Sequence, residues 1–231
     1  MMVQAVIGGA AAAAGIAAHG AFYRNSAVFG TALGRLPTRE RVVALTFDDG
    51  PNPDATPPIL DALADAGIHA TFFILGRHAE RWPQLVRRVH AEGHAIGNHG
   101  FYHRKLHFKS PAYVRDDLAR GADAIAHACG ARPALFRAPH GFRSPWVNRI
   151  ARSMGERVVG WSLGVWDSDR PGADVIARRT VDGARPGSIL LLHDGDGYDP
   201  SGDRRQTAEA VPAVLATLTA RGYRFVTVPV A

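Results

Sequence analysis

The sequence has little of what marks a disulfide-stabilised or a nucleic-acid-binding protein. Cys129 is its only cysteine, so no disulfide can form within the chain, and a packing role on a helix is the simplest interpretation. The formal net charge of +6 favours encounters with anionic partners such as nucleic acid, an acidic envelope polymer or a lipid surface. There is, however, no compact block of lysine and arginine, no aromatic-and-basic RNA motif and no helix-turn-helix signature, so we predict no nucleic-acid site.

Strongly hydrophobic runs are also missing near the N-terminus. Residues 1–18 are uncharged and rich in alanine and glycine, interrupted only by Gln4. This stretch is barely apolar enough for a membrane anchor, and no positive charge precedes it as in a signal peptide. Three interpretations stay open: a membrane anchor, a signal-like segment and a packed helix. If residues 1–18 span a membrane, Arg24 on their C-terminal side places the following domain in the cytoplasm.

Residues 37–231 have the pattern of one globular domain, and residues 1–36 are predicted to be a separate N-terminal segment. Of the 231 residues, 46% are hydrophobic and 21% are charged, as in a protein with one well-filled core. Short β-rich runs alternate with helical stretches, which indicates strand–helix units and a parallel α/β sheet. The predicted strands are Val42–Phe47, Ala70–Leu75, His94–Asn98, Ala134–Arg137, Arg157–Leu163, Ser188–His193 and Arg224–Val228.

Polar residues stand at the C-terminal ends of five of these strands. An open sheet would concentrate functional residues near one switch point, whereas a (β/α) barrel assembles its active site from many strand ends. We therefore predict a (β/α) barrel of about seven parallel strands. The strand-end residues are Asp48, Asp49, His99, Arg137, Asp167 and His193.

Two carboxylates and two histidines together indicate a metal site. Asp48 and Asp49 end a predicted strand, where one carboxylate can bind a metal while the other moves a proton. His99 and His103 are four residues apart, so a helical turn would place both rings on one face. Taken alone, the carboxylate pair is at least as well explained as a solvated acidic turn, and the histidine pair is better explained as two surface histidines. Two nitrogens and a carboxylate leave coordination positions open, which is typical of a catalytic metal site.

His193 and Arg137 carry side chains that suit catalysis. His193 ends a nearly continuous apolar run, so a titratable ring stands at the tip of an interior strand. A structural histidine bonded to a backbone carbonyl is an equally good interpretation. Arg137 precedes a proline turn and would suit orienting a carboxylate or an anionic group. Taken alone, it is better explained as a surface arginine.

Together the motifs resemble those of the polysaccharide deacetylases, the NodB-homology group of carbohydrate esterase family 4. Each motif is weak alone, but four in register between Arg41 and Val228 are specific. The resemblance implies a distorted (β/α) barrel and makes residues 37–231 a NodB-like deacetylase domain. The matching stretches are residues 46–50, 98–103, 137–141 and 190–193.

The resemblance assigns Asp49, His99 and His103 to a divalent metal, usually Zn²⁺, with Co²⁺ or another divalent ion as alternatives. The metal would polarise the acetamide carbonyl and stabilise the tetrahedral oxyanion. A backbone N–H near Gly50 or Asn52 would assist, which places Asn52 among the substrate-binding residues.

Acid–base roles follow from the same resemblance. Asp48 would be the general base for the water at the metal, and Arg137 would position Asp48. His193 would be the general acid that protonates the leaving amine. The fourth family motif fits worst, because Asp167 aligns with the Asp that supports this histidine, but Ser168 replaces the family's Trp.

Several residues near the expected cleft keep two interpretations. Asp169 is an alternative to Asp167 as the support of the acid. Trp161 and Trp166 would stack on a sugar ring, although a packed core tryptophan is the more frequent outcome. His140 is predicted to line the cleft.

The sequence therefore predicts a metal-dependent hydrolase that removes N-acetyl groups from a glycan, with peptidoglycan, a chitin-like oligomer or a glycolipid as the partner. Three alternatives stay open: a deacylase of a lipid-linked sugar, an O-acetyl esterase and a non-catalytic glycan-binding module on the same fold. The function favours the cell envelope or secretion without excluding the cytoplasm. Residues 1–18 would provide any membrane association.

Overall fold

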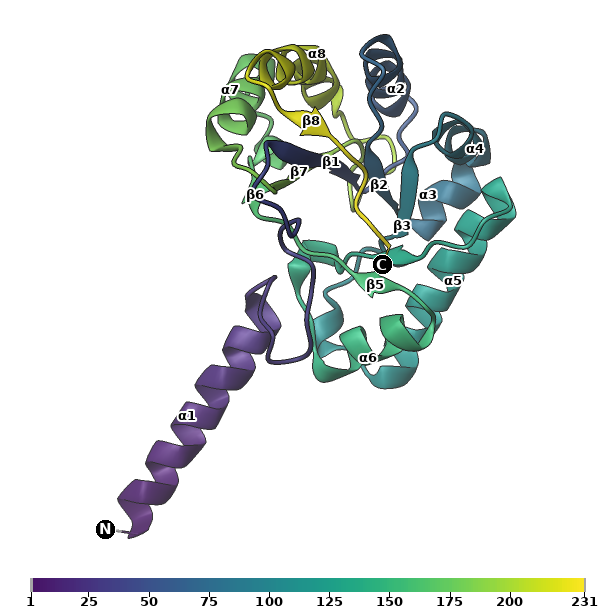
Figure 1. Cartoon of the computed structure of the whole chain (residues 1–231). Helices are drawn as coiled ribbons and strands as arrows, with labels where there is room; N and C mark the ends of the chain where they lie inside the picture. The colour runs from purple at the N-terminus through teal and green to yellow at the C-terminus, as the bar shows by residue number, and fades with distance from the viewer. Residues whose placement is uncertain (1, 231) are drawn as a thin grey trace.

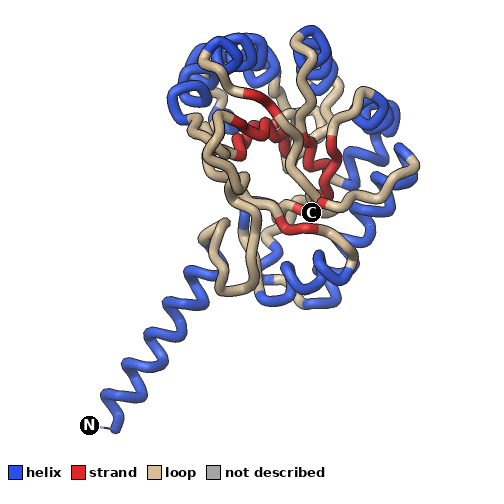
Figure 2. The backbone as a smooth tube through the Cα atoms, in the orientation of Figure 1, coloured by secondary structure: helices blue, strands red, loops and turns tan. Residues whose placement is uncertain are grey.

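A curled parallel sheet forms the centre of the protein, and helices surround it (Figure 1). The computed structural model describes residues 2–230, with side chains from residue 11 onward. Figure 2 shows the strands gathered around a common axis with the helices outside. The strands are β1 Val42–Asp48, β2 Thr71–Ile74, β3 Ala95–Asn98, β4 Leu135–Phe136, β5 Arg157–Val158, β6 Leu163–Gly164, β7 Ile189–His193 and β8 Arg224–Phe225.

The strand order confirms the predicted distorted barrel. Its path is β5-β4-β3-β2-β1-β7-β6, while β8 pairs with the first two residues of β1. All pairs are parallel, so the C-terminal strand ends lie at one edge, where Asp48 is in register with Phe73 and His193. The run predicted as one strand at Arg157–Leu163 is divided into β5 and β6, which lie at opposite ends of the path. The sheet therefore has eight strands.

The opening between the two ends of the sheet is spanned by residues from the N-terminal part of the chain. Leu33 forms a parallel bridge with Val159, directly after β5. Arg35 forms an antiparallel bridge with Ser188, directly before β7. The last part of segment 1–36 therefore contributes to the barrel.

Alternation along β1 determines which side chains lie at the C-terminal edge of the barrel interior. Val43, Leu45 and Phe47 pack into a core shared with the outer helices, whereas Ala44 packs on the other side with residues of the barrel interior. Because successive side chains of a strand alternate between faces, Asp48 lies on the same face as Ala44. This places the Asp48 carboxylate at the mouth of the barrel interior.

The helices connect the strands on the outside of the barrel. α5 begins at the capping residue Ser110, whose Oγ accepts a hydrogen bond from the backbone N–H of Tyr113, and it ends at Gly130 with φ of 80°. The helices are α1 Met2–Phe22, α2 Thr56–Asp65, α3 Gly76–Arg81, α4 Pro83–Ala91, α5 Pro111–Cys129, α6 Pro145–Ser153, α7 Ala173–Gly183 and α8 Arg205–Ala220, with short 3₁₀ turns η1 Leu106–Phe108, η2 Pro139–Gly141 and η3 Asp167–Asp169.

The N-terminal helix α1 extends away from the barrel and contacts it only near its last turn (Figure 1). Residues 11–19 are exposed. Among the described residues, no helix is both long enough and apolar enough to cross a membrane. The membrane association of residues 1–18 stays a prediction.

Candidate metal and catalytic site

Three side chains from two strand ends converge on one point. Asp49 Oδ1 lies 3.2 Å from His99 Nε2 and 3.1 Å from His103 Nε2. All three residues are buried, and one ligand atom from each lies within 4.8 Å of the others. Asp49 Oδ1 has no hydrogen-bond partner among the described residues, which is costly for a buried anion unless a cation completes the site. The cluster therefore fits a divalent metal.

Further contacts orient the side chains of this cluster. His99 Nδ1 lies 2.8 Å from the carbonyl oxygen of Arg137, so Nδ1 carries the proton and the Nε2 lone pair faces Asp49. Burial lowers the pKa of His103 to about 3, which keeps this ring neutral. Burial opposes the charge of Asp49, but the neighbouring His103 and His99 hold the pKa of Asp49 well below its usual range. Burial favours the neutral form of His99, but Asp48 and Asp49 raise the pKa of this ring, so binding of a metal would displace its proton.

The two histidines meet through a bend in the chain, so the predicted helical turn is wrong. β3 ends just before His99, and the following residues turn sharply, with positive φ at Gly100 (78°) and His103 (56°). Asp117 of α5 accepts hydrogen bonds from the two backbone N–H groups after Gly100, at 3.1 and 3.2 Å. This carboxylate holds the bend that brings the two rings together.

Arg137 holds one carboxylate oxygen of Asp48 and leaves the other without a hydrogen bond from it. Arg137 Nη1 donates to Asp48 Oδ1 at 2.6 Å and to Thr46 Oγ1 at 2.8 Å, and its Nη2 donates to the carbonyl of Gly160 at 2.9 Å. The second oxygen, Asp48 Oδ2, lies 3.8 Å from His99 Nε2. One carboxylate oxygen is therefore anchored while the other lies near His99.

His193 is paired with Asp167. Its Nδ1 lies 2.9 Å from Asp167 Oδ1, and its backbone N–H donates to Asp167 Oδ2 at 2.7 Å. Thr207 Oγ1 also donates to Asp167 Oδ2, at 3.0 Å. Burial favours the neutral ring, but the Asp167 carboxylate overcomes this and raises the pKa of His193 to about 9. Asp169, the alternative support, is exposed.

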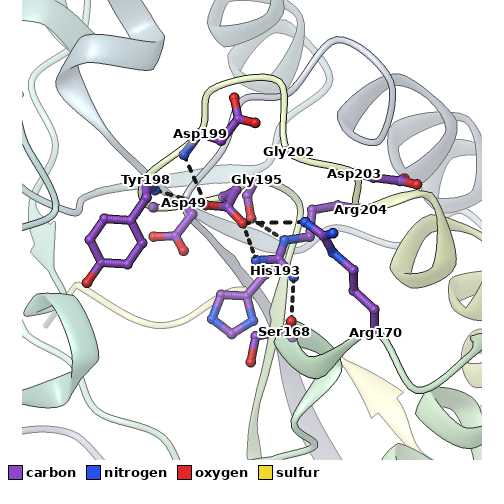
Figure 3. Close-up of polar contacts among 12 residues, drawn as sticks. Asp49, Ser168, Arg170, His193, Gly195, Tyr198, Asp199, Gly202, Asp203 and Arg204 are labelled. Atoms are coloured by element: carbon purple, nitrogen blue, oxygen red, sulfur yellow. Dashed lines mark hydrogen bonds and ion pairs between the residues drawn. The ribbon is translucent and has the colours of Figure 1, made fainter.

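A loop after β7 forms the rim beside His193 (Figure 3). Arg204 is buried and joins three parts of this rim: Nε donates to the carbonyl of Gly195 at 2.8 Å, Nη1 to the carbonyl of Ser168 at 3.1 Å and Nη2 to Asp196 Oδ2 at 2.9 Å. Asp196 Oδ1 in turn accepts from the backbone N–H of Tyr198 at 2.9 Å. The loop is thereby tied to η3, which carries Asp167.

Three of the predicted substrate-binding residues line the cleft of about 590 Å³ that contains these groups. His140 Nε2 lies 3.0 Å from the hydroxyl of Tyr198. Trp166 is 70% exposed, whereas Trp161 is partly buried beneath the guanidinium of Arg24, 5.1 Å from its ring centroid. Trp166 is therefore the tryptophan whose ring is open to a ligand.

The fourth predicted substrate-binding residue, Asn52, does not face the cleft. It is only 1% exposed, and its backbone N–H donates to Thr56 Oγ1 at 2.8 Å. Its side-chain amide donates to the carbonyls of Pro200 and Gly202 at 3.2 and 3.1 Å. The prediction that its N–H assists at the oxyanion is therefore wrong, because that N–H already has a partner inside the protein.

Some residues of the site were not found from the sequence. Thr46 stands two positions before Asp48, so the alternation of the strand could have indicated it. An irregular loop without a local motif carries Tyr198 and Arg204, and only the fold brings them to the cleft. The fold likewise brings Thr207, near the start of α8, to Asp167.

Known proteins match this chain over most of its length. The family profile described as "Polysaccharide deacetylase" matches residues 35–159. A chitooligosaccharide deacetylase of Bradyrhizobium sp. (strain ANU 289) is 39% identical over 198 residues, covering 82% of this chain and 90% of that protein. A peptidoglycan-N-acetylglucosamine deacetylase of Bacillus cereus is 38% identical over 198 residues, covering 84% and 89%. A crystal structure of a peptidoglycan N-acetylglucosamine deacetylase superposes with a TM-score of 0.80 at 32% identity, covering 85% of this chain and 90% of that one.

Proposed function

This chain belongs to the polysaccharide deacetylase family, and from that premise we propose that it hydrolyses the N-acetyl groups of a glycan in a metal-dependent reaction. Relatives named for chitooligosaccharide and peptidoglycan deacetylation support an N-acetylated amino-sugar chain as the substrate. The products are a free amino sugar and acetate. The observation that carries the proposal is one cleft holding three features: the His–His–Asp cluster, an arginine-held Asp48 and an aspartate-held His193.

Asp49, His99 and His103 would hold the cation, with Zn²⁺ as the first candidate and Co²⁺ as an alternative. When bound, the cation polarises the acetamide carbonyl and makes the attacking water more acidic. The ligand set of two imidazoles and one carboxylate supports a catalytic rather than a structural metal, because it leaves positions for water and substrate.

Asp48 is the proposed general base. Arg137 anchors Oδ1, so Oδ2 remains to accept a proton from the attacking water. The water oxygen forms the new bond to the carbonyl carbon as that proton moves to Asp48. Arg137 acts as a positioning residue, since it contacts the base through Oδ1 and is itself fully buried.

His193 is the proposed general acid. Asp167 engages Nδ1, which leaves Nε2 to donate a proton to the leaving nitrogen as the C–N bond breaks. A pKa of about 9 keeps His193 protonated at neutral pH, as this role requires. His140, Trp161 and Trp166 are the proposed substrate contacts, because all three line the cleft.

Release of acetate tests the proposal directly. We would incubate wild type with Zn²⁺ or Co²⁺, chelated enzyme and Asp48→Asn with chitooligosaccharides, peptidoglycan fragments and an O-acetylated sugar. The proposal expects metal-dependent acetate release from an N-acetylated glycan that Asp48→Asn loses by at least about a hundredfold. Release that survives both chelation and the substitution would refute it. Preference for the O-acetylated sugar would make the enzyme an esterase instead.

A further inference from the structure

Three phenylalanine rings from separate parts of the chain, two of them exposed and one partly buried, gather around His107 beside the cleft. This aromatic ledge consists of Phe22 at the end of α1, Phe108 in η1 and Phe142 after η2. The centroid of Phe22 lies 5.4 Å from that of Phe142 and 6.5 Å from that of Phe108, both edge to face. Phe22 is 53% exposed and Phe108 is 78% exposed. Exposed aromatic groups of this size are unfavourable in water and mark binding surfaces.

The aromatic ledge is continuous with the catalytic cleft. Phe22 and Phe142 belong to the same cleft lining as Asp48 and His193. A series of ring contacts leads outward from the metal cluster, with centroid separations of 4.5 Å from His103 to His140 and 5.8 Å from His140 to Phe142. A further step of 5.4 Å leads from Phe142 to Phe22, so the ledge lies outward along the cleft from His103.

The position of Phe22 is determined by buried hydrogen bonds. Arg143 is 1% exposed, and its backbone N–H donates to the carbonyl of Ala21 at 3.1 Å. Its guanidinium donates to the carbonyls of Ser26 at 2.6 Å and Gly30 at 3.0 Å. The end of α1 is therefore held against the barrel, and Phe22 is presented at a defined place.

Phe22 and the rest of α1 lie outside the family match, which begins at residue 35, whereas Phe108 and Phe142 lie within it. We propose that the aromatic ledge binds a second sugar unit of the glycan, beyond the unit that loses its acetyl group; this rests on the proposed function. The C–H face of a sugar ring is apolar and flat enough to stack on a phenylalanine ring. The substrate class is accordingly an oligomer or polymer, and the N-terminal helix supplies part of its binding surface.

A substitution at Phe22 tests this with a neighbouring control. Tyr23 is also aromatic and 51% exposed, but it stacks on His19 and does not line the cleft. We would measure kcat and KM of wild type, Phe22→Ala, Phe22→Trp and Tyr23→Ala with N-acetylglucosamine and with the chitin hexamer. Phe22→Ala should raise KM for the hexamer about threefold to tenfold with kcat retained. It should leave N-acetylglucosamine, which has no second sugar unit, unaffected. Phe22→Trp should restore binding, and Tyr23→Ala should match wild type.

Direct binding separates this proposal from the catalytic one. Calorimetric titration of the hexamer into the same variants needs no turnover, so it reports on the ledge even if no acetate is released. Weaker hexamer binding in Phe22→Ala than in Tyr23→Ala supports the ledge. Equal affinity in the two variants, equal loss for N-acetylglucosamine and hexamer, or no hexamer binding by wild type would overturn it.

Discussion

Arg137 and Asp48 form a buried ion pair in which a single N–O contact of 2.6 Å fixes one oxygen of the carboxylate. Arg137 is fully buried and also donates to Thr46 and to the carbonyl of Gly160. A guanidinium can make these contacts together because its donors form a rigid planar fork. This rigidity would serve the proposed role of Asp48, since a general base must be held within hydrogen-bond reach of the water it deprotonates.

Arg137→Lys should separate positioning from charge. The lysine retains the positive charge but cannot reach all three acceptors, so we expect kcat to fall about a hundredfold. If Arg137 acts through Asp48, the double variant with Asp48→Asn should be no slower than Asp48→Asn alone. Steady-state rates for the four proteins, with thermal unfolding as a check on folding, measure this. Losses that multiply would show that Arg137 acts independently of Asp48.

Asp167→Asn should change the pH dependence of the reaction. Because His193 must be protonated to act as an acid, activity should be lost as the pH rises through its pKa of about 9. Removing the Asp167 charge lowers this pKa, so the alkaline limb of kcat/KM should move to lower pH. Asp169→Asn, two positions away and exposed, should leave the limb in place. If the alkaline limb of kcat/KM stays in place in Asp167→Asn, His193 is not the general acid.

The strand ends are the part of the site that the sequence could predict. Asp48, Asp49 and His193 end or directly follow strands, and a parallel sheet brings such residues to one edge whatever the loops do. The division of Arg157–Leu163 into β5 and β6 could not be predicted, because it depends on the sheet opening there and on Leu33 pairing with Val159. Local propensity contains no information about such long-range pairing.

Residues in irregular segments were harder to predict than those on strands. The sequence spacing of His99 and His103 predicted the right partners for the wrong reason, since a bend with positive φ replaces the helical turn. Asn52 looked available for the oxyanion, but its N–H is used by Thr56. Phe22 could not be connected with the cleft, because only the buried hydrogen bonds of Arg143 place α1 beside it.

The variants His103→Ala and His107→Ala should differ in how much metal they bind. His103→Ala removes one of three ligands, so we expect metal bound per protein to fall strongly at low free Zn²⁺. His107 follows His103 by four residues, as His103 follows His99, but His107 lies outside the cluster. The variant His107→Ala should therefore retain the metal. Elemental analysis after dialysis measures this. Equal metal contents in the two variants would contradict the assigned site.

Chelation should also lower the stability of the wild type. A cation that binds only the folded protein stabilises it by about 4 kcal/mol when its free concentration is about 1,000 times its Kd. The midpoint of thermal unfolding should therefore fall on chelation and return when Zn²⁺ is added. In His103→Ala the midpoint should respond little to either treatment. If chelation leaves the midpoint of wild-type unfolding unchanged, Asp49, His99 and His103 hold no cation.

Glu156 offers a prediction about stability that is independent of catalysis. It is 2% exposed, Asn98 Nδ2 donates to its Oε1 at 2.9 Å and its Oε2 has no partner among the described residues. Burial raises the pKa of Glu156 to about 8, against the opposing effects of Asn98 and the charge of Arg132. Between the ordinary carboxyl pKa and about 8, the folded state therefore holds a proton that the unfolded state has released. Stability falls across this window, by up to about 1.4 kcal/mol per pH unit.

Glu156→Gln should remove this pH dependence, because the neutral amide keeps an oxygen for Asn98 and has no proton to lose. The variant should be more stable than wild type at pH 8, and the difference should shrink towards pH 4.5, where the wild-type carboxyl is protonated in the folded state. Urea unfolding at several pH values measures this. Glu209→Gln, at an exposed position of α8, should change stability by less than about 0.5 kcal/mol throughout. Parallel pH profiles for wild type and Glu156→Gln would show that the buried carboxyl is ionised in the folded protein, with its charge compensated by its surroundings.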